Sequence, residues 1–132
     1  MESFMRFVRA LFGLTLLLIS SSAFAAETVP FDAARFAAAQ RADEPILVHI
    51  RASWCPTCAA QKPILERLTA EPDFKNLVVF TVDFDTQKDV VRRFHADMQS
   101  TLIAFKGATE TGRSVGDTDE SSIAKLLRSA ER

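Results

Sequence analysis

The sequence predicts an α/β domain with a central mixed β-sheet flanked by helices on both faces. Short apolar runs rich in β-branched residues alternate along the chain with segments of helical periodicity. This alternation is typical of parallel strands joined by helices that cover both faces of the sheet. Near the C-terminus, two strand-like segments follow each other across a glycine turn, which adds an antiparallel pair to the same sheet.

The first three expected elements are a helix, a strand and a second helix. Residues 31–41 are rich in alanine and carry apolar side chains at helical spacing, so they predict a helix. Residues 46–50 form a short apolar, β-branched run that predicts a buried strand. The second helix is expected to begin at Pro56, where the missing N–H of proline costs nothing, and to end near Ala70.

The remaining elements complete the sheet and its helical cover. Residues 77–82 predict a second buried strand, and a short helix is expected from residue 86 to residue 95. Residues 101–105 predict a third strand, and a short fourth strand is expected around residues 113–115. The last helix is expected to begin at residue 119 and to bury an apolar stripe.

The composition fits one globular domain. The 132 residues are 48% hydrophobic and 25% charged, which is too apolar for a disordered chain. The formal net charge is −1, with 16 lysines and arginines against 17 acidic residues. Because no basic excess is available to neutralise phosphates, we expect no nucleic-acid partner. Two cysteines are too few for a small domain held together by several disulfides.

Residues 1–25 have the layout of a secretory signal peptide. Arg6 and Arg9 give a positive start, residues 11–19 are mostly apolar, and three serines follow. The segment ends in Ala23-Phe24-Ala25, which matches the small-residue pattern of a cleavage site. We therefore predict removal of this segment during export.

A membrane anchor is the alternative for the same segment. The uncharged stretch over residues 10–26 has 17 residues, which is at the short limit for a membrane span, and its C-terminal part is small and polar. These features favour cleavage, which leaves residues 26–132 as a single domain in the periplasm or outside the cell. Disulfides form and persist in such compartments.

The most informative feature is Cys55-Pro56-Thr57-Cys58, at the point where a predicted strand passes into a predicted helix. Unpaired N–H groups and the helix dipole favour negative charge at a helix N-terminus. A thiolate is therefore favoured at Cys55, and the thiolate is the attacking form of cysteine. We expect Cys58, one turn later, to lie on the same face but deeper. This arrangement suits a nucleophile and a resolving thiol.

Several motifs in register resemble the thioredoxin family over nearly all of residues 26–132. The residues that carry the resemblance are Trp54-Cys55-Pro56-Thr57-Cys58, Pro63 five residues later, Val82-Asp83-Phe84-Asp85, Thr101-Leu102-Ile103-Ala104-Phe105-Lys106 and Gly116. The resemblance implies a thioredoxin-like fold and a thiol–disulfide oxidoreductase. It also implies partner proteins that present disulfides or dithiols.

The resemblance further implies which residues meet those partners. We expect Cys55 and Cys58 to be catalytic, and we expect substrate contacts from Trp54, Pro56, Thr57, Ser100 and Thr101. An exported reductase of this family needs an electron source, for which a membrane-bound thiol donor is the candidate. We expect a monomer with no cofactor and no bound metal.

The sequence departs from the family pattern at Ser100, where the family usually has a cis-proline. A cis bond before a residue other than proline costs roughly 3–4 kcal/mol, so we expect a trans peptide here. The loop should still face the cysteines. Its backbone groups or the Ser100 hydroxyl could then bind a substrate strand.

The second departure is His49, which stands where many thioredoxins have a buried aspartate that relays a proton to the second cysteine. An imidazole exchanges protons near neutral pH, so His49 is a candidate catalytic residue that deprotonates Cys58. Its alternative role is that of a core histidine on a strand, and the sequence leaves both open.

A different class of function also fits a Cys-x-x-Cys pair. Thiolates bind soft metals such as Cu(I) or Zn, so the chain could be a metal-binding or partner-docking module without turnover. Only two cysteines are present, however, and no adjacent histidine completes four ligands within the motif. An oxidoreductase is therefore the favoured interpretation, with the direction of electron flow left open.

Overall fold

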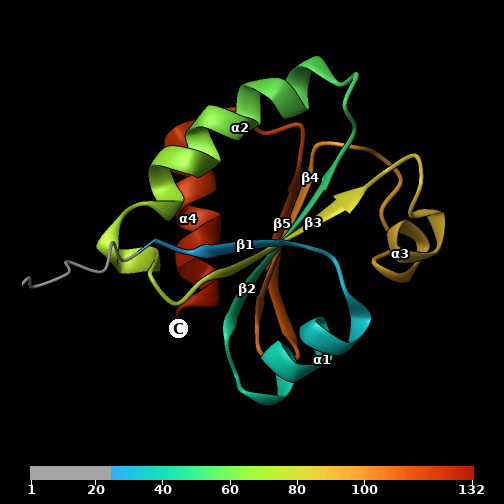
Figure 1. The fold of residues 1–132 in the computed structure, drawn as a ribbon. Helices are drawn as coiled ribbons and strands as arrows, with labels where there is room; N and C mark the ends of the chain where they lie inside the picture. Colours follow the sequence, from blue (N-terminus) through green and yellow to red (C-terminus); the bar gives the residue numbers. More distant parts are fainter. Residues whose placement is uncertain (1–24) are drawn as a thin grey trace, which may run out of the picture.

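The computed structural model describes residues 25–132 (Figure 1). The predicted signal peptide, residues 1–25, therefore lies outside the described residues apart from Ala25. The elements in chain order are β1 (Glu27–Pro30), α1 (Ala33–Arg41), β2 (Pro45–Arg51), α2 (Pro56–Thr69), a short 3-10 helix (Pro72–Phe74), β3 (Val78–Asp83), α3 (Lys88–Arg93), β4 (Thr101–Lys106), β5 (Thr109–Val115) and α4 (Glu120–Ala130). Within this part of the chain, no helix is both long and apolar enough to cross a membrane.

The strands form one mixed sheet in the order β1-β3-β2-β4-β5. β1, β3 and β2 run parallel, while β4 is antiparallel to both β2 and β5. The predicted mixed sheet is thereby confirmed. The pairing also brings four strand ends to one edge of the sheet, because Arg51 pairs with Asp83, Ile50 pairs with Thr101, and Thr101 pairs with Val115.

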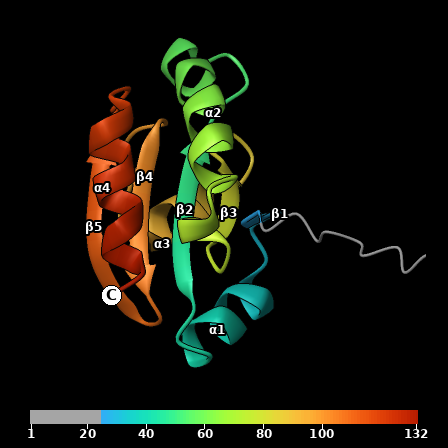
Figure 2. The same cartoon turned by 90° about the vertical axis from the view of Figure 1, so that its left-hand side faces the viewer.

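Helices cover both faces of the sheet, as predicted. α2 and α4 lie side by side on one face, whereas α1 and α3 lie on the other (Figures 1 and 2). Successive strand residues point to opposite faces. On β2, Leu47 packs in the cluster under α2 and α4, and Ile46 and Val48 pack in the cluster under α1 and α3. His49 follows Leu47 by two positions and therefore belongs to the α2 face.

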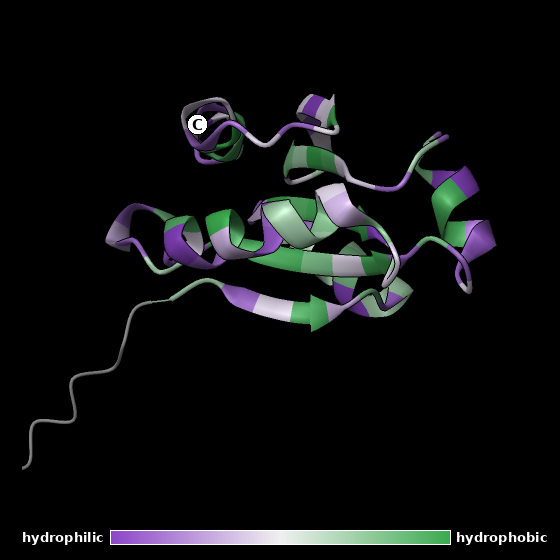
Figure 3. Ribbon diagram, turned by 90° about the horizontal axis from the view of Figure 1, so that it is seen from above, coloured by the Kyte–Doolittle hydropathy of each residue, from purple (hydrophilic) through white to green (hydrophobic). Residues whose placement is uncertain are grey.

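Apolar residues concentrate on the strands in the middle of the molecule, and the helices carry their hydrophilic stretches outward (Figure 3). The face under α1 and α3 is mainly aromatic. Its rings contact one another with centroids 5.3 to 6.0 Å apart, and they belong to Phe31, Phe36, Phe80, Phe94 and Phe105. This cluster lies on the face of the sheet away from His49.

Two parts of the sheet were not predicted correctly from sequence. β1 was not expected at all, because its four residues are largely exposed, end in proline and show no periodicity. Its strand conformation comes from pairing with β3 along residues 78–81. β5 is longer than expected, because its exposed polar residues extend the pairing with β4 back to Thr109.

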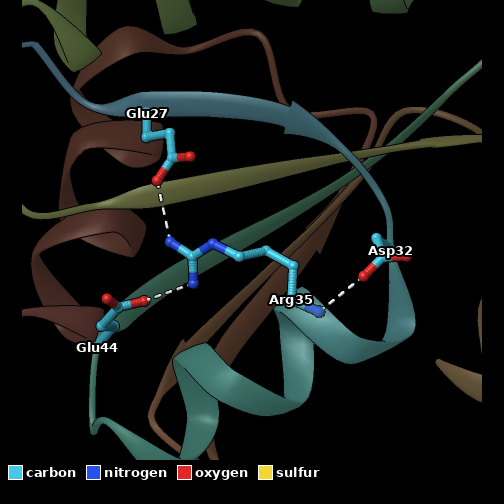
Figure 4. A network of polar contacts seen from close by, with 4 residues as sticks. All are labelled: Glu27, Asp32, Arg35 and Glu44. Carbon is cyan, nitrogen blue, oxygen red and sulfur yellow. Dashed lines mark hydrogen bonds and ion pairs between the residues drawn. The ribbon is translucent and has the colours of Figure 1, made fainter.

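An ion-pair network also holds β1 in place (Figure 4). The Arg35 guanidinium on α1 donates to Glu27 on β1 at 2.9 Å and to Glu44 just before β2 at 3.0 Å. The backbone N–H of Arg35 donates to the Asp32 carboxylate at 2.7 Å, and this bond caps the N-terminus of α1. The two glutamates, Glu44 foremost, raise the pKa of Arg35 above its ordinary value.

Candidate functional site: the cysteine pair and its buried histidine

Cys55 and Cys58 lie where β2 passes into α2, at the edge of the sheet where four strand ends meet. Cys55 is the N-cap of α2, with an extended backbone, and Pro56 occupies the first turn as predicted. The backbone N–H of Cys58 points at the Cys55 sulfur at 3.1 Å. The two residues are joined as a disulfide, with their Cα atoms 5.2 Å apart. The first sulfur therefore sits where helix N–H groups stabilise negative charge.

Both cysteines are buried in this disulfide form, Cys55 with 3% and Cys58 with 5% of its surface exposed. The two cysteines are therefore buried to nearly the same extent, without the difference in exposure that a deeper Cys58 would bring. The physical reason is that the pair packs as one unit against Ala52 and Phe84. The N-cap position also folds the Cys55 side chain back over the first turn of the helix, where it accepts the Cys58 N–H.

Trp54 stands beside this pair with 58% of its surface exposed. Its indole N–H donates to the Asp85 carboxylate at 2.7 Å, which fixes the ring against the turn after β3. Asp83 builds that turn, because its carboxylate accepts the backbone N–H groups of Asp85 and Thr86. These bonds, with Thr86 foremost, lower the pKa of Asp83 below its ordinary value. The indole is thus an apolar surface held in a fixed place.

The loop before β4 reaches the same edge of the sheet. The peptide bonds around Ser100 are trans, as expected, like every other peptide bond in residues 25–132. Ser100 takes the left-handed conformation with φ of 57°, which is unfavourable for a residue other than glycine. Its carbonyl accepts from Gly116 N–H at 2.9 Å and from the Gln61 side chain at 3.2 Å, and its hydroxyl donates to the Gln99 carbonyl at 2.5 Å.

The other predicted substrate residues differ in what they offer to a partner. Pro56 is exposed and Thr57 is partly exposed, so both present surface beside Cys55. Thr101 is buried as the first residue of β4, and its hydroxyl donates to the Met98 carbonyl at 2.6 Å. The Ser100 carbonyl and hydroxyl are likewise engaged within the loop.

His49 lies on β2 with 5% of its surface exposed. Burial, together with the positive charge of Arg51, lowers the pKa of His49 from 6.5 to about 4, and a side-chain interaction with Gln61 partly opposes the fall. The imidazole is therefore neutral at neutral pH. Its Nε2 atom is buried and has no hydrogen-bond partner among the described residues.

A cavity of about 320 Å³ connects His49 with the cysteine pair. It lies between α2 and the parallel strands, and its wall includes His49, Arg51, Cys55, Cys58, Lys62 and Thr81. A space of this size with polar groups on its wall can hold water. The structure thus places His49 and Cys58 on the wall of one pocket, which a sequence separation of nine residues alone does not establish.

Gln61 is the residue at this site that sequence analysis missed. It is fully buried in α2, three positions after Cys58, and contacts both the Ser100 loop and His49. Glutamine is an ordinary helix former, so nothing in its type marks it. The available signal was its position on the helix face that also carries Cys58 and Leu65.

The described residues contain no group of three or more histidine, cysteine or acidic side chains arranged to hold a metal ion. A metal-binding module would therefore depend on the two thiolates of Cys55 and Cys58. Zinc sites in proteins usually use four ligands.

Comparison with known proteins decides the family. A sequence model of the family described as Thioredoxin matches residues 27–129. The chain belongs to the thioredoxin family. With its cysteine pair at disulfide distance, this member of the thioredoxin family is a thiol–disulfide oxidoreductase, and proteins of the thioredoxin family generally act on protein disulfides.

Individual relatives agree with this assignment. The chain is 34% identical to a thioredoxin of Chlamydia trachomatis over 82 residues, which cover 62% of this chain and 78% of the relative. A solved structure of Trxlp from Edwardsiella tarda superposes with a TM-score of 0.75 at 40% identity, over 76% of this chain and 98% of the other. A thioredoxin of Malassezia sympodialis shares the fold with a TM-score of 0.71 at 19% identity, over 82% of this chain and 93% of the other.

Proposed function

We propose that this chain is an exported thiol–disulfide oxidoreductase that uses Cys55-Pro56-Thr57-Cys58 to reduce or exchange disulfides in partner proteins. The observation that carries the proposal is the position of Cys55 at the N-cap of α2, with the Cys58 N–H directed at its sulfur. In the reduced protein the same N–H and the helix dipole stabilise a Cys55 thiolate. Cys55 is therefore the attacking residue and Cys58 the resolving residue.

The proposed reaction has two exchange steps. The Cys55 thiolate attacks one sulfur of the partner disulfide, so a mixed disulfide forms and the other partner sulfur leaves as a thiolate, which takes a proton. Cys58 then loses its proton and attacks the Cys55 sulfur. The bond from Cys55 to the partner breaks as the Cys55–Cys58 bond forms, and the second partner sulfur leaves. Two electrons pass from the cysteine pair to the partner, and the reverse sequence oxidises a partner dithiol.

In this mechanism His49 takes the proton of Cys58. The support is geometric: both residues line one cavity, and the imidazole carries no charge at neutral pH. Because the pKa of His49 is low, the ring holds the proton of Cys58 only in passing. A water molecule in a cavity of this size could carry the proton between them. The imidazolium then returns its proton to solvent through the same cavity.

The exposed surface around Cys55 is the proposed docking site for the partner. Trp54, Pro56 and Thr57 present surface from one side. Met98 and Val115 are exposed apolar residues next to Ser100 and Gly116, on the loop and strand end that meet at the same edge. Because the Ser100 carbonyl and hydroxyl are engaged internally, the partner chain meets the rest of this loop, with Ser100 and Thr101 setting its shape.

The cellular setting is part of the proposal. The signal-peptide layout of residues 1–25 supports export to the periplasm or beyond, where a membrane-bound thiol donor would supply electrons. We propose that the processed chain works as a monomer. Fractionation of cells that express the full chain with a C-terminal tag tests the location. A processed form that begins at Ala26 is expected outside the cytoplasm, and an unprocessed cytoplasmic form contradicts this part.

Reduction of insulin with dithiothreitol as electron donor tests the activity. The wild-type chain is expected to accelerate insulin precipitation, and both Cys55→Ser and Cys58→Ser are expected to fall to the uncatalysed rate. Cys58→Ser should also accumulate a mixed disulfide with insulin on non-reducing gels, whereas Cys55→Ser should not. A wild-type rate equal to that of Cys55→Ser, or mixed disulfides formed through Cys58, would contradict the assignment.

A further inference from the structure

Gln61 is the polar side chain most completely removed from solvent in the described chain. Four polar side chains are buried in residues 25–132, namely His49, Gln61, Ser100 and Thr101, and all four lie at or next to the cysteine site. Gln61 is 0% exposed. Burial of an amide is costly unless its hydrogen bonds are made, so the partners of Gln61 explain why a glutamine is tolerated there.

The amide nitrogen of Gln61 joins two loops. It donates to the Ser100 carbonyl at 3.2 Å and to the Asp117 carbonyl at 2.9 Å. The backbone N–H of Gly116 also donates to the Ser100 carbonyl. Both loops turn through left-handed residues at this point, with φ of 57° at Ser100 and 69° at Gly116. Gln61 therefore ties α2 to the loop before β4 and to the segment before α4.

These two bonds also fix the direction of the amide oxygen. A flipped amide would place oxygen against two carbonyl oxygens, so the nitrogen must face the loops and the oxygen must face away from them. The oxygen, Oε1, is buried and has no hydrogen-bond partner among the described residues. His49 Nε2 is buried without a partner as well, and His49 interacts with Gln61. The two unsatisfied atoms thus belong to neighbouring side chains, one an acceptor and the other able to carry a proton.

We propose that Gln61 is a positioning residue that holds a proton on Nε2 of His49 and leaves Nδ1 free to receive the proton of Cys58. This inference rests on the role of His49 in the proposed function. When Cys58 attacks the mixed disulfide, its proton passes to Nδ1, and the Nε2–H takes Gln61 Oε1 as its acceptor. The imidazolium is then stabilised by a buried acceptor, and its extra proton leaves to solvent as the partner thiolate is released.

The same amide links proton transfer to the substrate-facing loop. Because one side chain contacts both His49 and the Ser100 carbonyl, a shift of the loop when a partner docks would move the acceptor of the histidine proton. Gln61 therefore belongs to the machinery of the second exchange step and not to that of the first, which depends on the Cys55 thiolate.

Stopped-flow reaction of the reduced protein with a chromogenic aromatic disulfide separates the two steps. The first equivalent of coloured thiol reports attack by Cys55, and the second reports resolution by Cys58. Gln61→Met keeps most of the volume without the amide and is expected to slow the second phase about tenfold, with the first phase changed by less than about twofold. Gln40→Met is the matched control, because Gln40 donates to the Gly107 carbonyl on the opposite face of the sheet, and both phases should stay unchanged.

A double-mutant cycle with His49→Ala distinguishes the two hypotheses. In the His49→Ala background, Gln61→Met should change the second phase by less than about twofold, since its effect acts through His49. Equal slowing in both backgrounds, or slowing of the first phase, overturns the role of Gln61 while the role of His49 stands. If His49→Ala itself leaves the second phase unchanged, the proton role of His49 fails, and the inference about Gln61 fails with it.

The protonated ring nitrogen of His49 can also be identified in the wild-type chain, so this test does not depend on the folding of a variant. The nitrogen chemical shifts of the two histidines report which ring nitrogen holds the proton. His49 is expected to be neutral at neutral pH with its proton on Nε2. A neutral His49 with the proton on Nδ1 would overturn the proposed contact with Gln61.

Discussion

Replacement of His49 by asparagine should remove a specific loss of stability at acid pH. In the folded protein the pKa of His49 is about 4, against 6.5 for the ordinary group, mainly because the ring is buried. Between these two values the unfolded chain binds a proton that the folded protein excludes, so stability falls as the pH drops. The penalty is absent above the unfolded pKa, grows below it, and is complete below the folded pKa.

The size of this loss follows from the two pKa values. Linkage gives a loss of about 1.4 kcal/mol at about pH 5.5 and about 2.5 kcal/mol at about pH 4.5, both relative to about pH 7.5. The positive charge of Arg51 adds to the shift, and Gln61 opposes it. Other acidic groups also titrate in this range, so the informative quantity is the difference between wild type and variant.

Urea unfolding of the oxidised domain at these pH values measures the difference. The advantage of wild type over His49→Asn should shrink by about 2.5 kcal/mol between about pH 7.5 and about pH 4.5. Gln40→Asn is the control, because it exchanges one uncharged side chain for another, and its profile should run parallel to that of wild type. Parallel profiles for wild type and His49→Asn would refute the assignment of a buried neutral histidine.

Three further substitutions test other parts of the structure. Gly107→Ala should lower the free energy of unfolding by about 1–2 kcal/mol in urea, because Gly107 has φ of 56° and a Cβ there would lie 2.6 Å from the Asp43 carboxylate; an unchanged midpoint would contradict this. Phe36→Ala should cost about 3–5 kcal/mol, since Phe36 is buried among aromatic rings, yet it should leave the rate of Cys58 resolution at its wild-type value when measured on the folded protein. Trp54→Ala should raise KM for a protein disulfide about three- to tenfold with a smaller change in kcat, whereas a fall in kcat alone would exclude a docking role.

Much of the fold could be predicted because the buried strands can be recognised from their own residues. β2, β3 and β4 are apolar runs whose alternate residues fill two different core clusters, so their own pattern specifies them. β1 has no such pattern. It is a strand because β3, at residues 78–81, offers an unpaired edge and because Arg35 holds Glu27 in place, and neither cause is written in the four residues of β1 themselves. The exposed half of β5 is specified in the same way by β4.

The features of the site likewise fall into those that the local sequence specifies and those that only tertiary packing specifies. The cysteine motif predicted the N-cap position of Cys55, because a proline in the first turn and the strand before it fix where the helix begins. The pocket shared by His49 and Cys58 depends on the packing of α2 against β2, which the motif does not specify. Gln61 was beyond prediction for a similar reason. Its partners, Ser100 and Asp117, lie 39 and 56 residues away and meet it only in the folded chain.

Titration of the reduced protein shows whether the N-terminus of α2 holds Cys55 as a thiolate. Thiolate absorbance in the ultraviolet, recorded for wild type and for Cys55→Ser, isolates the ionisation of the Cys55 thiol. Because Cys55 is the N-cap of α2, this thiol is expected to ionise at clearly lower pH than free cysteine, whose midpoint is about 8.5. A midpoint at or above that of free cysteine would contradict the assignment of Cys55 as the attacking thiolate.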